Sequence, residues 1–261
     1  MTTTRTLGLA RRRPITRDRW LLERPYVGRA TSLETVMQPL ASLHDQRRKP
    51  SCVGQAHAQG IEAFVGYRVS AVDLWEGARI LQGSAQDAAA GTRGEYAIEW
   101  LERHGWGDYV PGEDTRPQSD DRDTKTGGTL AGAMRAAQRS GRILRHQTID
   151  TRRPITEVVR QVVGALAAGG VYVVLEGGTT PAYQQPPPDT VLGTTHRAGD
   201  SGGHAERIVG WSAGREAFIL QGSWGAWTWC HLPDGERAMG CCLVSPAVVA
   251  RAWAIDVVRV Q

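Results

Sequence analysis

The chain contains few cysteines. Only four of its 261 residues are cysteine, namely Cys52, Cys230, Cys241 and Cys242. A secreted disulfide scaffold carries more cysteines at spread spacings, and the adjacent Cys241 and Cys242 would not easily bridge each other within ordinary disulfide geometry. We therefore expect a reducing compartment, or a fold that does not depend on disulfides.

Long apolar runs are also missing. No stretch approaches the roughly 18 consecutive apolar residues that a membrane-spanning helix needs. The apolar stretch at residues 7–10 is too short for the core of a secretory signal peptide. We expect neither a signal peptide nor a membrane span, and hence a protein that is cytoplasmic or associated with an assembly such as a virion.

The chain also has only a small excess of positive over negative charge. The formal net charge is +4, from 31 Lys and Arg against 27 Asp and Glu, and much of the excess is arginine near the N-terminus. A nucleic-acid-binding surface would interleave basic and aromatic side chains on one face. We interpret the run of three arginines at 11–13 as a solvated arm and expect no nucleic-acid partner.

Metal and phosphate sites lack their usual spacing. Cys230, His231, Cys241 and Cys242 are the residue types of a zinc site, but the paired ligands two to four residues apart are absent. The glycine-rich stretch at 126–133 lacks the lysine and the spacing of a phosphate-binding loop. We expect no metal and no cofactor.

Helical patterns fill the first part of the chain. With 261 residues, the chain is long enough for one large domain or two small ones. Apolar periodicity predicts a helix with a weak point at Gly60, and Gly105 is a plausible helix end. The predicted helices cover residues 52–68, 71–82, 94–104, 128–140 and 155–168, with a loop at 112–128.

Strand patterns fill the second part. Runs rich in β-branched residues predict strands at 171–177, 207–211, 216–224 and 254–260, with a proline-rich loop at 181–189. A helix-rich part followed by a strand-rich part favours an α+β fold with two lobes. We divide the chain into an N-terminal arm (1–41), a helical lobe (42–150) and a strand-rich lobe (151–261).

Cys52 stands at the start of a predicted helix. A thiol is a good nucleophile only as the thiolate, and a helix N-terminus or a nearby imidazolium lowers its pKa. His204, just before a predicted strand, would supply the imidazolium if it folds across to meet Cys52. Gln46, six residues before Cys52, could donate to an oxyanion together with the Cys52 N–H. Taken alone, Cys52 also fits a buried core thiol.

Three ordered motifs resemble the papain-like cysteine peptidases, including their bacterial and phage relatives. They are Asp45-Gln46 with Cys52 six residues after Gln46, Gly203-His204-Ala205 followed by Val209-Gly210-Trp211, and Phe218-Ile219-Leu220 running into Ser223-Trp224-Gly225. The resemblance spans residues 42 to 230. It implies a helical lobe and a β-barrel-like lobe that form one catalytic domain, with the active-site cleft between them.

The resemblance also implies roles for single residues. Cys52 would be the nucleophile, His204 the general base and acid, and Gln46 the oxyanion donor of a thiol protease that cleaves peptide or protein substrates. Trp224 would cover the site and exclude water. Gly203 would let a substrate backbone approach closely.

One position departs from the family pattern. The family places an asparagine directly before Ser-Trp-Gly, where its amide orients the histidine, and this chain has Gly222 there. Gln221 points to the opposite face of a regular strand, so it would orient His204 only if a bulge at Gly222 turned it back. Otherwise a backbone carbonyl or a water holds the ring, or activity is low. Asp189, Asp200 and Glu206 could pair with histidines, but we interpret them as solvated carboxylates.

Two other functions stay open. Gly222 also fits a catalytically weak or inactive papain-like protein that serves as a structural part of a larger assembly, for example a phage virion. Protein assembly partners would then replace a substrate. A peptidoglycan-cutting hydrolase uses the same order of cysteine and histidine.

Overall fold

The protein is described here from a computed structural model, which covers residues 25–47, 50–84, 91–109, 139–141, 143–179, 181–193 and 203–261. The predicted loop at 112–128, the glycine-rich stretch at 126–133 and Asp200 lie outside these ranges. Residues 139–141 form a strand, so the end of the helix predicted at 128–140 is extended backbone instead.

The helices begin and end close to the predicted bounds. Helix α2 stops three residues before the predicted residue 68, because Gly66 takes the left-handed conformation (φ 77°) and ends it. None of the described helices has both the length and the apolar character needed to cross a bilayer. The helical elements are α2 (Cys52–Val65), α3 (Ala71–Gln82), α4 (Gly94–His104), α7 (Ile155–Ala167), α8 (Pro181–Gln184), the 3₁₀ helix η1 (Ala213–Arg215) and α9 (Pro246–Val249).

The strands of the described residues form one large sheet and two small ones. The large sheet has eight strands in the order β4-β12-β5-β7-β8-β11-β6, with β1 beside β7. Neighbours run antiparallel except β6 and β11, which are parallel. The strands are β1 (Val36–Met37), β2 (Trp106–Gly107), β3 (Arg139–Gly141), β4 (Ile143–Thr148), β5 (Val171–Gly178), β6 (Val191–Leu192), β7 (Gly203–Ser212), β8 (Ala217–Gln221), β9 (Trp229–His231), β10 (Arg237–Met239), β11 (Cys241–Val244) and β12 (Ala254–Val260).

The mixed α+β class is confirmed, and the four predicted strands correspond to β5, β7, β8 and β12. Strands β4 and β11 were not predicted. The sequence of β4 (ILRHQT) is largely polar, and β11 (CCLV) is only four residues long. Both gain their hydrogen bonds from strands that are distant in sequence, β12 and β8 respectively.

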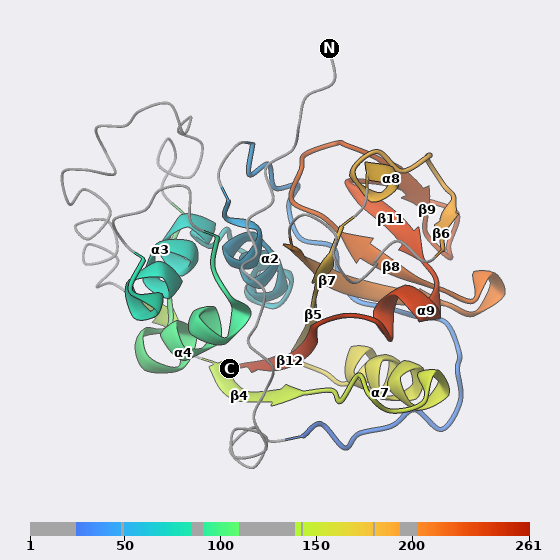
Figure 1. Cartoon of the computed structure of the whole chain (residues 1–261), viewed down its shortest axis with the longest axis horizontal. Coiled ribbons are helices and arrows are strands. Elements are labelled where there is room, and N and C mark those ends of the chain that lie inside the picture. The colour runs from blue at the N-terminus through green and yellow to red at the C-terminus, as the bar shows by residue number, and fades with distance from the viewer. Residues whose placement is uncertain are drawn as a thin grey trace.

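Helix α2 lies between the sheet and helices α3 and α4 (Figure 1). Gly60 in the middle of α2 makes this close packing possible. A Cβ at this position would lie 2.3 Å from the ring of Tyr172 on β5, so only glycine lets the helix approach the sheet there. The weak point that periodicity indicated is thus a contact with the sheet.

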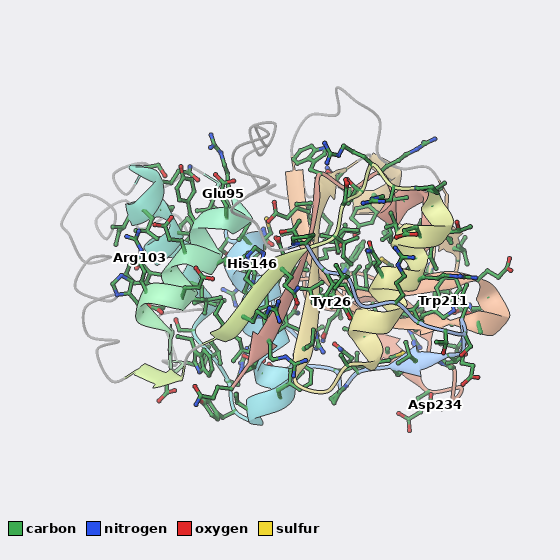
Figure 2. The ribbon with its side chains drawn as sticks, turned by 90° about the horizontal axis from the view of Figure 1, so that it is seen from below. Tyr26, Glu95, Arg103, His146, Trp211 and Asp234 are labelled. Atoms are coloured by element: carbon green, nitrogen blue, oxygen red, sulfur yellow. The ribbon has the colours of Figure 1, made fainter. Side chains whose placement is uncertain are left out.

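Helix α7 covers the opposite face of the sheet. It packs on β5 and β7 and encloses a second apolar cluster, with Trp211 inside it and Tyr26 at its edge (Figure 2). The segment at 25–47, most of which was predicted as an arm, runs along this layer. Tyr26 N–H donates to Thr148 O at 3.0 Å, and Gln38 N–H donates to Val209 O at 2.8 Å. This segment then leads directly into Gln46.

Candidate active site

Cys52 is the first residue of α2, and its side chain is fully buried. The thiol therefore lies at the positive end of the helix dipole, and the first turn contains no acidic residue that would oppose it. Cys52 belongs to the same buried cluster as Ala205, the residue after His204 on β7. Helix α2 packs directly against β7, so the two lobes meet at this point.

Gln46 is held by Ser223 from the strand-rich lobe. Its backbone N–H donates to Ser223 O at 2.8 Å, and the Ser223 hydroxyl donates to Gln46 Oε1 at 2.5 Å. Because the oxygen of the amide accepts this bond, the amino group Nε2 is the end that faces away from Ser223 and can donate elsewhere.

A short antiparallel pairing continues this contact. Asp45 forms a β-bridge with Trp224, and Gly225 N–H donates to His44 O at 2.8 Å. Two segments about 180 residues apart in the chain thus run side by side over residues 44–46 and 223–225. Any movement of Trp224 relative to Gln46 would break backbone hydrogen bonds.

His204 is the second residue of β7 and is only 2% exposed. Its ring stacks on the indole of Trp224, with centroids 4.0 Å apart and planes 17° from parallel. Across the ladder it pairs with Gly177, and Gly203 pairs with Gly178, so the backbone beside the histidine carries no side chains. The predicted covering residue therefore lies on the predicted base.

An aromatic cluster supports Trp224 from behind. Trp227 meets Trp224 edge to face at 5.2 Å between ring centroids, and Tyr183 lies 6.5 Å from Trp224 and 5.9 Å from Trp227. Such edge-to-face contacts fix ring orientation in addition to burying apolar area. The plane against which His204 stacks is therefore rigid.

Glu206 is buried, which corrects its interpretation as a solvated carboxylate. It is 2% exposed, and its Oε1 lies 3.8 Å from His204 Nε2. Burial raises the pKa of Glu206 to about 8. The signal was present in the sequence, since residues two apart on a strand share a face, but the fully buried environment was not visible there.

Gln221 is engaged on the other face of the sheet. Its Nε2 donates to Ala41 O at 2.9 Å, and its Oε1 accepts from the Ala41 N–H at 3.2 Å and from Arg207 Nη1 at 3.5 Å. The register shift between β7 and β8 lies between Ile208 and Gly210, away from Gly222. The amide of Gln221 thus serves to hold the segment that leads to Gln46.

Arg207 completes that second face. Its guanidinium donates to Gln38 Oε1 at 3.2 Å and to Gln59 O on α2 at 3.4 Å, and Gln59 Nε2 donates to Gly222 O at 3.0 Å. Burial lowers the pKa of Arg207 to about 10, which leaves it charged at neutral pH. These bonds fix α2 relative to β7 and β8.

The residues considered for zinc are arranged otherwise. His231 contacts Asp189, which also binds Arg215 at 2.8 Å. Burial raises the pKa of Cys230 to about 12, so this thiol is neutral at physiological pH. Within the described ranges, no group of three or more potential metal ligands comes together.

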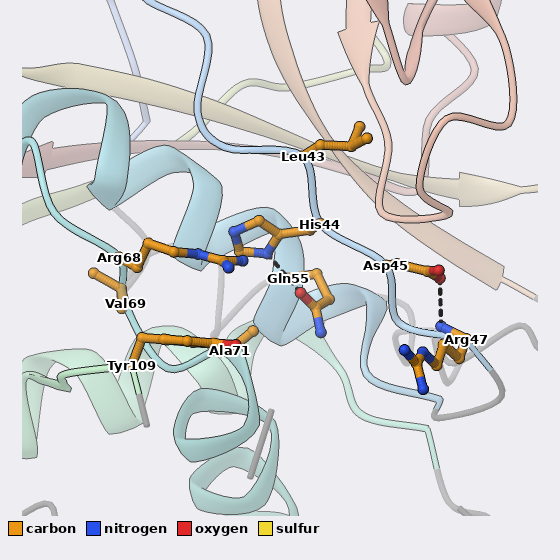
Figure 3. Close-up of a pocket in the computed structure, with 9 residues that line it drawn as sticks. All are labelled: Leu43, His44, Asp45, Arg47, Gln55, Arg68, Val69, Ala71 and Tyr109. Carbon is orange, nitrogen blue, oxygen red and sulfur yellow. Dashed lines mark hydrogen bonds between the residues drawn. The ribbon is translucent and has the colours of Figure 1, made fainter. Parts of the chain in front are cut away.

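A pocket of about 130 Å³ lies beside the segment that carries Gln46 (Figure 3). The pocket is lined by Leu43, His44, Asp45, Arg47, Gln55, Arg68, Val69, Ala71 and Tyr109. Inside it, His44 Nδ1 donates to Gln55 Oε1 at 2.6 Å. The pocket brings two arginines, Arg47 and Arg68, to the side of the site formed by the helical lobe.

Comparison with known proteins gives a fold. No protein-family model matches the chain, and no curated protein matches its sequence. Among solved structures, xylellain, a cysteine protease from Xylella fastidiosa, matches with a TM-score of 0.67 over 100% of this chain and 98% of its own, at 16% identity. The chain has the papain-like fold.

Two further structures extend this match. Digestive procathepsin L 3 of the Tenebrio molitor larval midgut has a TM-score of 0.62 over 90% of this chain and 73% of its own, at 16% identity. The proCathepsin B S9 of Trypanosoma congolense has a TM-score of 0.61 over 98% of this chain and 87% of its own, at 14% identity. The papain-like fold therefore covers both lobes of this chain, as the sequence motifs indicated.

Proposed function

We propose that the chain is a cysteine peptidase or a related amide hydrolase. The observation that carries this proposal is the pairing of residues 44–46 with 223–225, because it joins Gln46 to Ser223 and places Trp224 on the ring of His204. Cys52, at the start of the helix that packs on β7, supplies the nucleophile. The papain-like fold and its cysteine-protease neighbours support the same chemistry.

The reaction would proceed in two steps. The Cys52 thiolate, paired with the His204 imidazolium, attacks the amide carbonyl, and the negative oxygen receives hydrogen bonds from Gln46 Nε2 and the Cys52 N–H. His204 gives its proton to the leaving amine as the C–N bond breaks, which leaves a thioester. His204 then takes a proton from water, whose oxygen displaces the thiolate and releases the acid.

Selective alkylation tests the nucleophile. We expect iodoacetamide or an epoxide probe to modify Cys52 at neutral pH faster than it modifies free cysteine, although the side chain is fully buried in the unliganded chain. Cys52→Ala should abolish labelling and hydrolysis, while Cys230→Ala, which removes a thiol with a raised pKa, should change neither. A folded wild-type chain in which Cys52 does not react would contradict the proposal and favour a structural role in an assembly.

Loss of the Gln46 amide tests the oxyanion site. Gln46→Ala should lower kcat by about 10²–10³-fold, because one donor to the negative oxygen is missing in the transition state. Alkylation of Cys52 involves no oxyanion, so its rate should change little. Equal losses in both assays would mean that Gln46 is needed only to keep the site folded.

Comparing hydrolysis of different amide substrates tests which class of substrate the chain cleaves. Casein and short fluorogenic peptides test a general peptidase acting on peptide or protein substrates. Hydrolysis of cell-wall peptides, but of neither of these, would support the peptidoglycan-cutting alternative.

A further inference from the structure

Gly222 is required by space rather than by backbone conformation. Its φ lies outside the left-handed region, so its backbone does not call for glycine. A Cβ there would lie 2.8 Å from Glu206 Oε1 and 2.9 Å from Trp227 Nε1, closer than real Cβ contacts come. The carboxylate of Glu206 therefore reaches into the volume that a side chain at Gly222 would occupy.

Among the described residues, His204 is the neighbour on the same face that can balance a negative charge on Glu206. Its Oε1 is buried with no hydrogen-bond partner among the residues that the structure describes, and His204 Nε2 is 3.8 Å away. Arg207, the next residue along β7, turns to the opposite face and binds Gln38. Cys241 and Cys242 on β11 interact electrostatically with Glu206, but burial raises the pKa of both thiols, so they are neutral and cannot balance its charge.

We propose that Glu206 is the positioning residue for His204, with its carboxylate accepting a hydrogen bond from Nε2 of the ring. This inference rests on the proposed function, since it assigns a role within the Cys52–His204 pair. Glu206 would do from β7 what an asparagine side chain would do from the position of Gly222, directly after the neighbouring strand β8. The two residues depend on each other, because the absence of a side chain at Gly222 leaves the space that the Glu206 carboxylate occupies.

The arrangement fixes which ring nitrogen serves the nucleophile. With Nε2–H directed to Glu206, Nδ1 is the atom that exchanges a proton with the Cys52 sulfur. Burial alone raises the pKa of Glu206 to about 8, and the positive charge of an imidazolium 3.8 Å away lowers it again, so the two groups ionise together and the attraction between their charges favours a hydrogen bond. Trp224 keeps the ring in plane while this happens.

The test measures the alkylation rate of Cys52 by iodoacetamide from pH 4 to 10 in the full-length wild-type chain and in Glu206→Gln. Without the carboxylate the imidazolium is less stable, so fewer thiolates form at neutral pH. We expect a loss of about 10–100-fold between about pH 5 and 7, which corresponds to an increase of about one to two in the pKa of the thiol. The loss should vanish at alkaline pH, where the thiol ionises without help.

A double variant tests whether an asparagine at position 222 can replace Glu206 in orienting His204. Glu206→Ala alone should lower the alkylation rate at neutral pH. Glu206→Ala with Gly222→Asn should recover much of it, because the amide oxygen of the introduced asparagine can accept from Nε2 in the space that Glu206 leaves, once the Trp227 indole, 2.9 Å from the new Cβ, shifts to admit it. Asp189→Asn, which removes a carboxylate beside another histidine, His231, serves as the matched control and should leave the profile unchanged.

The outcomes separate this inference from the proposed function. A wild-type Cys52 no faster than free cysteine overturns the proposed function. A fast wild type whose profile coincides with that of Glu206→Gln overturns the inference alone. A Glu206→Gln loss that persists at pH 10 also overturns it, because blocked access rather than proton placement would be the cause. A folded double variant that stays as slow as Glu206→Ala contradicts it too.

Discussion

Two buried histidine–glutamate pairs in this molecule differ in the distance between the ring nitrogen and the carboxylate. We call the hydrogen-bonded pair, His44 and Glu62, the closed pair, and the more widely separated pair, His204 and Glu206, the open pair. In the helical lobe, His44 Nε2 lies 3.0 Å from both carboxylate oxygens of Glu62. In the strand-rich lobe, His204 Nε2 lies 3.8 Å from Glu206 Oε1. All four side chains are nearly inaccessible to solvent, so burial alone does not explain the difference.

The surroundings of the two carboxylates explain it. Burial raises the pKa of Glu62, but hydrogen bonds from His44, the Ser42 hydroxyl and the Val69 N–H outweigh burial, and the net pKa is lowered. Glu206 has no such set of donors in the described part of the chain, and burial raises its pKa to about 8. The first pair stabilises the fold, whereas the second retains a costly buried carboxyl beside His204, the proposed base.

The largest effect should follow from removing the histidine of the open pair. His204→Ala should lower kcat/KM by roughly 10⁴-fold or more, because the base and the acid of the reaction are lost together. The melting temperature should change by only a few degrees. His231→Gln, at the half-exposed pair with Asp189, is the control. Similar activity losses in both variants would contradict a specific catalytic role for His204.

Opening the closed pair should cost stability instead. Glu62→Gln weakens charged hydrogen bonds to His44, Ser42 and Val69, and we expect a loss of about 2–3 kcal/mol in the free energy of unfolding. Denaturant titration at pH 7 measures it.

The same loss depends on pH with a defined sign. Because the pKa of Glu62 is lowered in the folded state, its contribution is complete above the ordinary value of 4.5 and disappears as pH falls through the lower folded value. The wild type and Glu62→Gln should therefore converge in acid. Convergence toward alkaline pH would contradict this account.

A stability effect with the opposite pH dependence should follow at Glu206. A pKa raised to about 8 means that wild-type stability is fully present below about pH 4.5 and is lost as pH rises toward 8. The neutral isostere Glu206→Gln should therefore be more stable than the wild type at pH 9, by up to about 5 kcal/mol, and equal to it near pH 4. A variant that is less stable at pH 9 would show that Glu206 serves the fold.

The smallest effect should come from the exposed pair. Asp189 accepts from Arg215 and His231, and these bonds lower its pKa, but all three side chains reach solvent. Asp189→Asn should cost about 1 kcal/mol or less in the free energy of unfolding and leave hydrolysis unchanged. A cost above about 2 kcal/mol would mean that this pair also stabilises the fold.

Much of the fold could be predicted because its signals are local. Helices α3 and α4 and strand β12 have the predicted bounds, since apolar periodicity, glycine at a helix end and runs of β-branched residues act over a few neighbouring positions. Strands β4 and β11 escaped prediction because a partner strand, rather than their own composition, makes them strands.

The same division runs through the candidate site. The sequence alone determined the order of Gln46, Cys52 and His204 and the start of a helix at the cysteine, because each depends on residues close by in the chain. Only the tertiary structure decided that Gln221 faces Ala41 and Arg207, and that Glu206 fills the space left at Gly222. Contacts across strands are set by register and packing, which no stretch of residues encodes by itself.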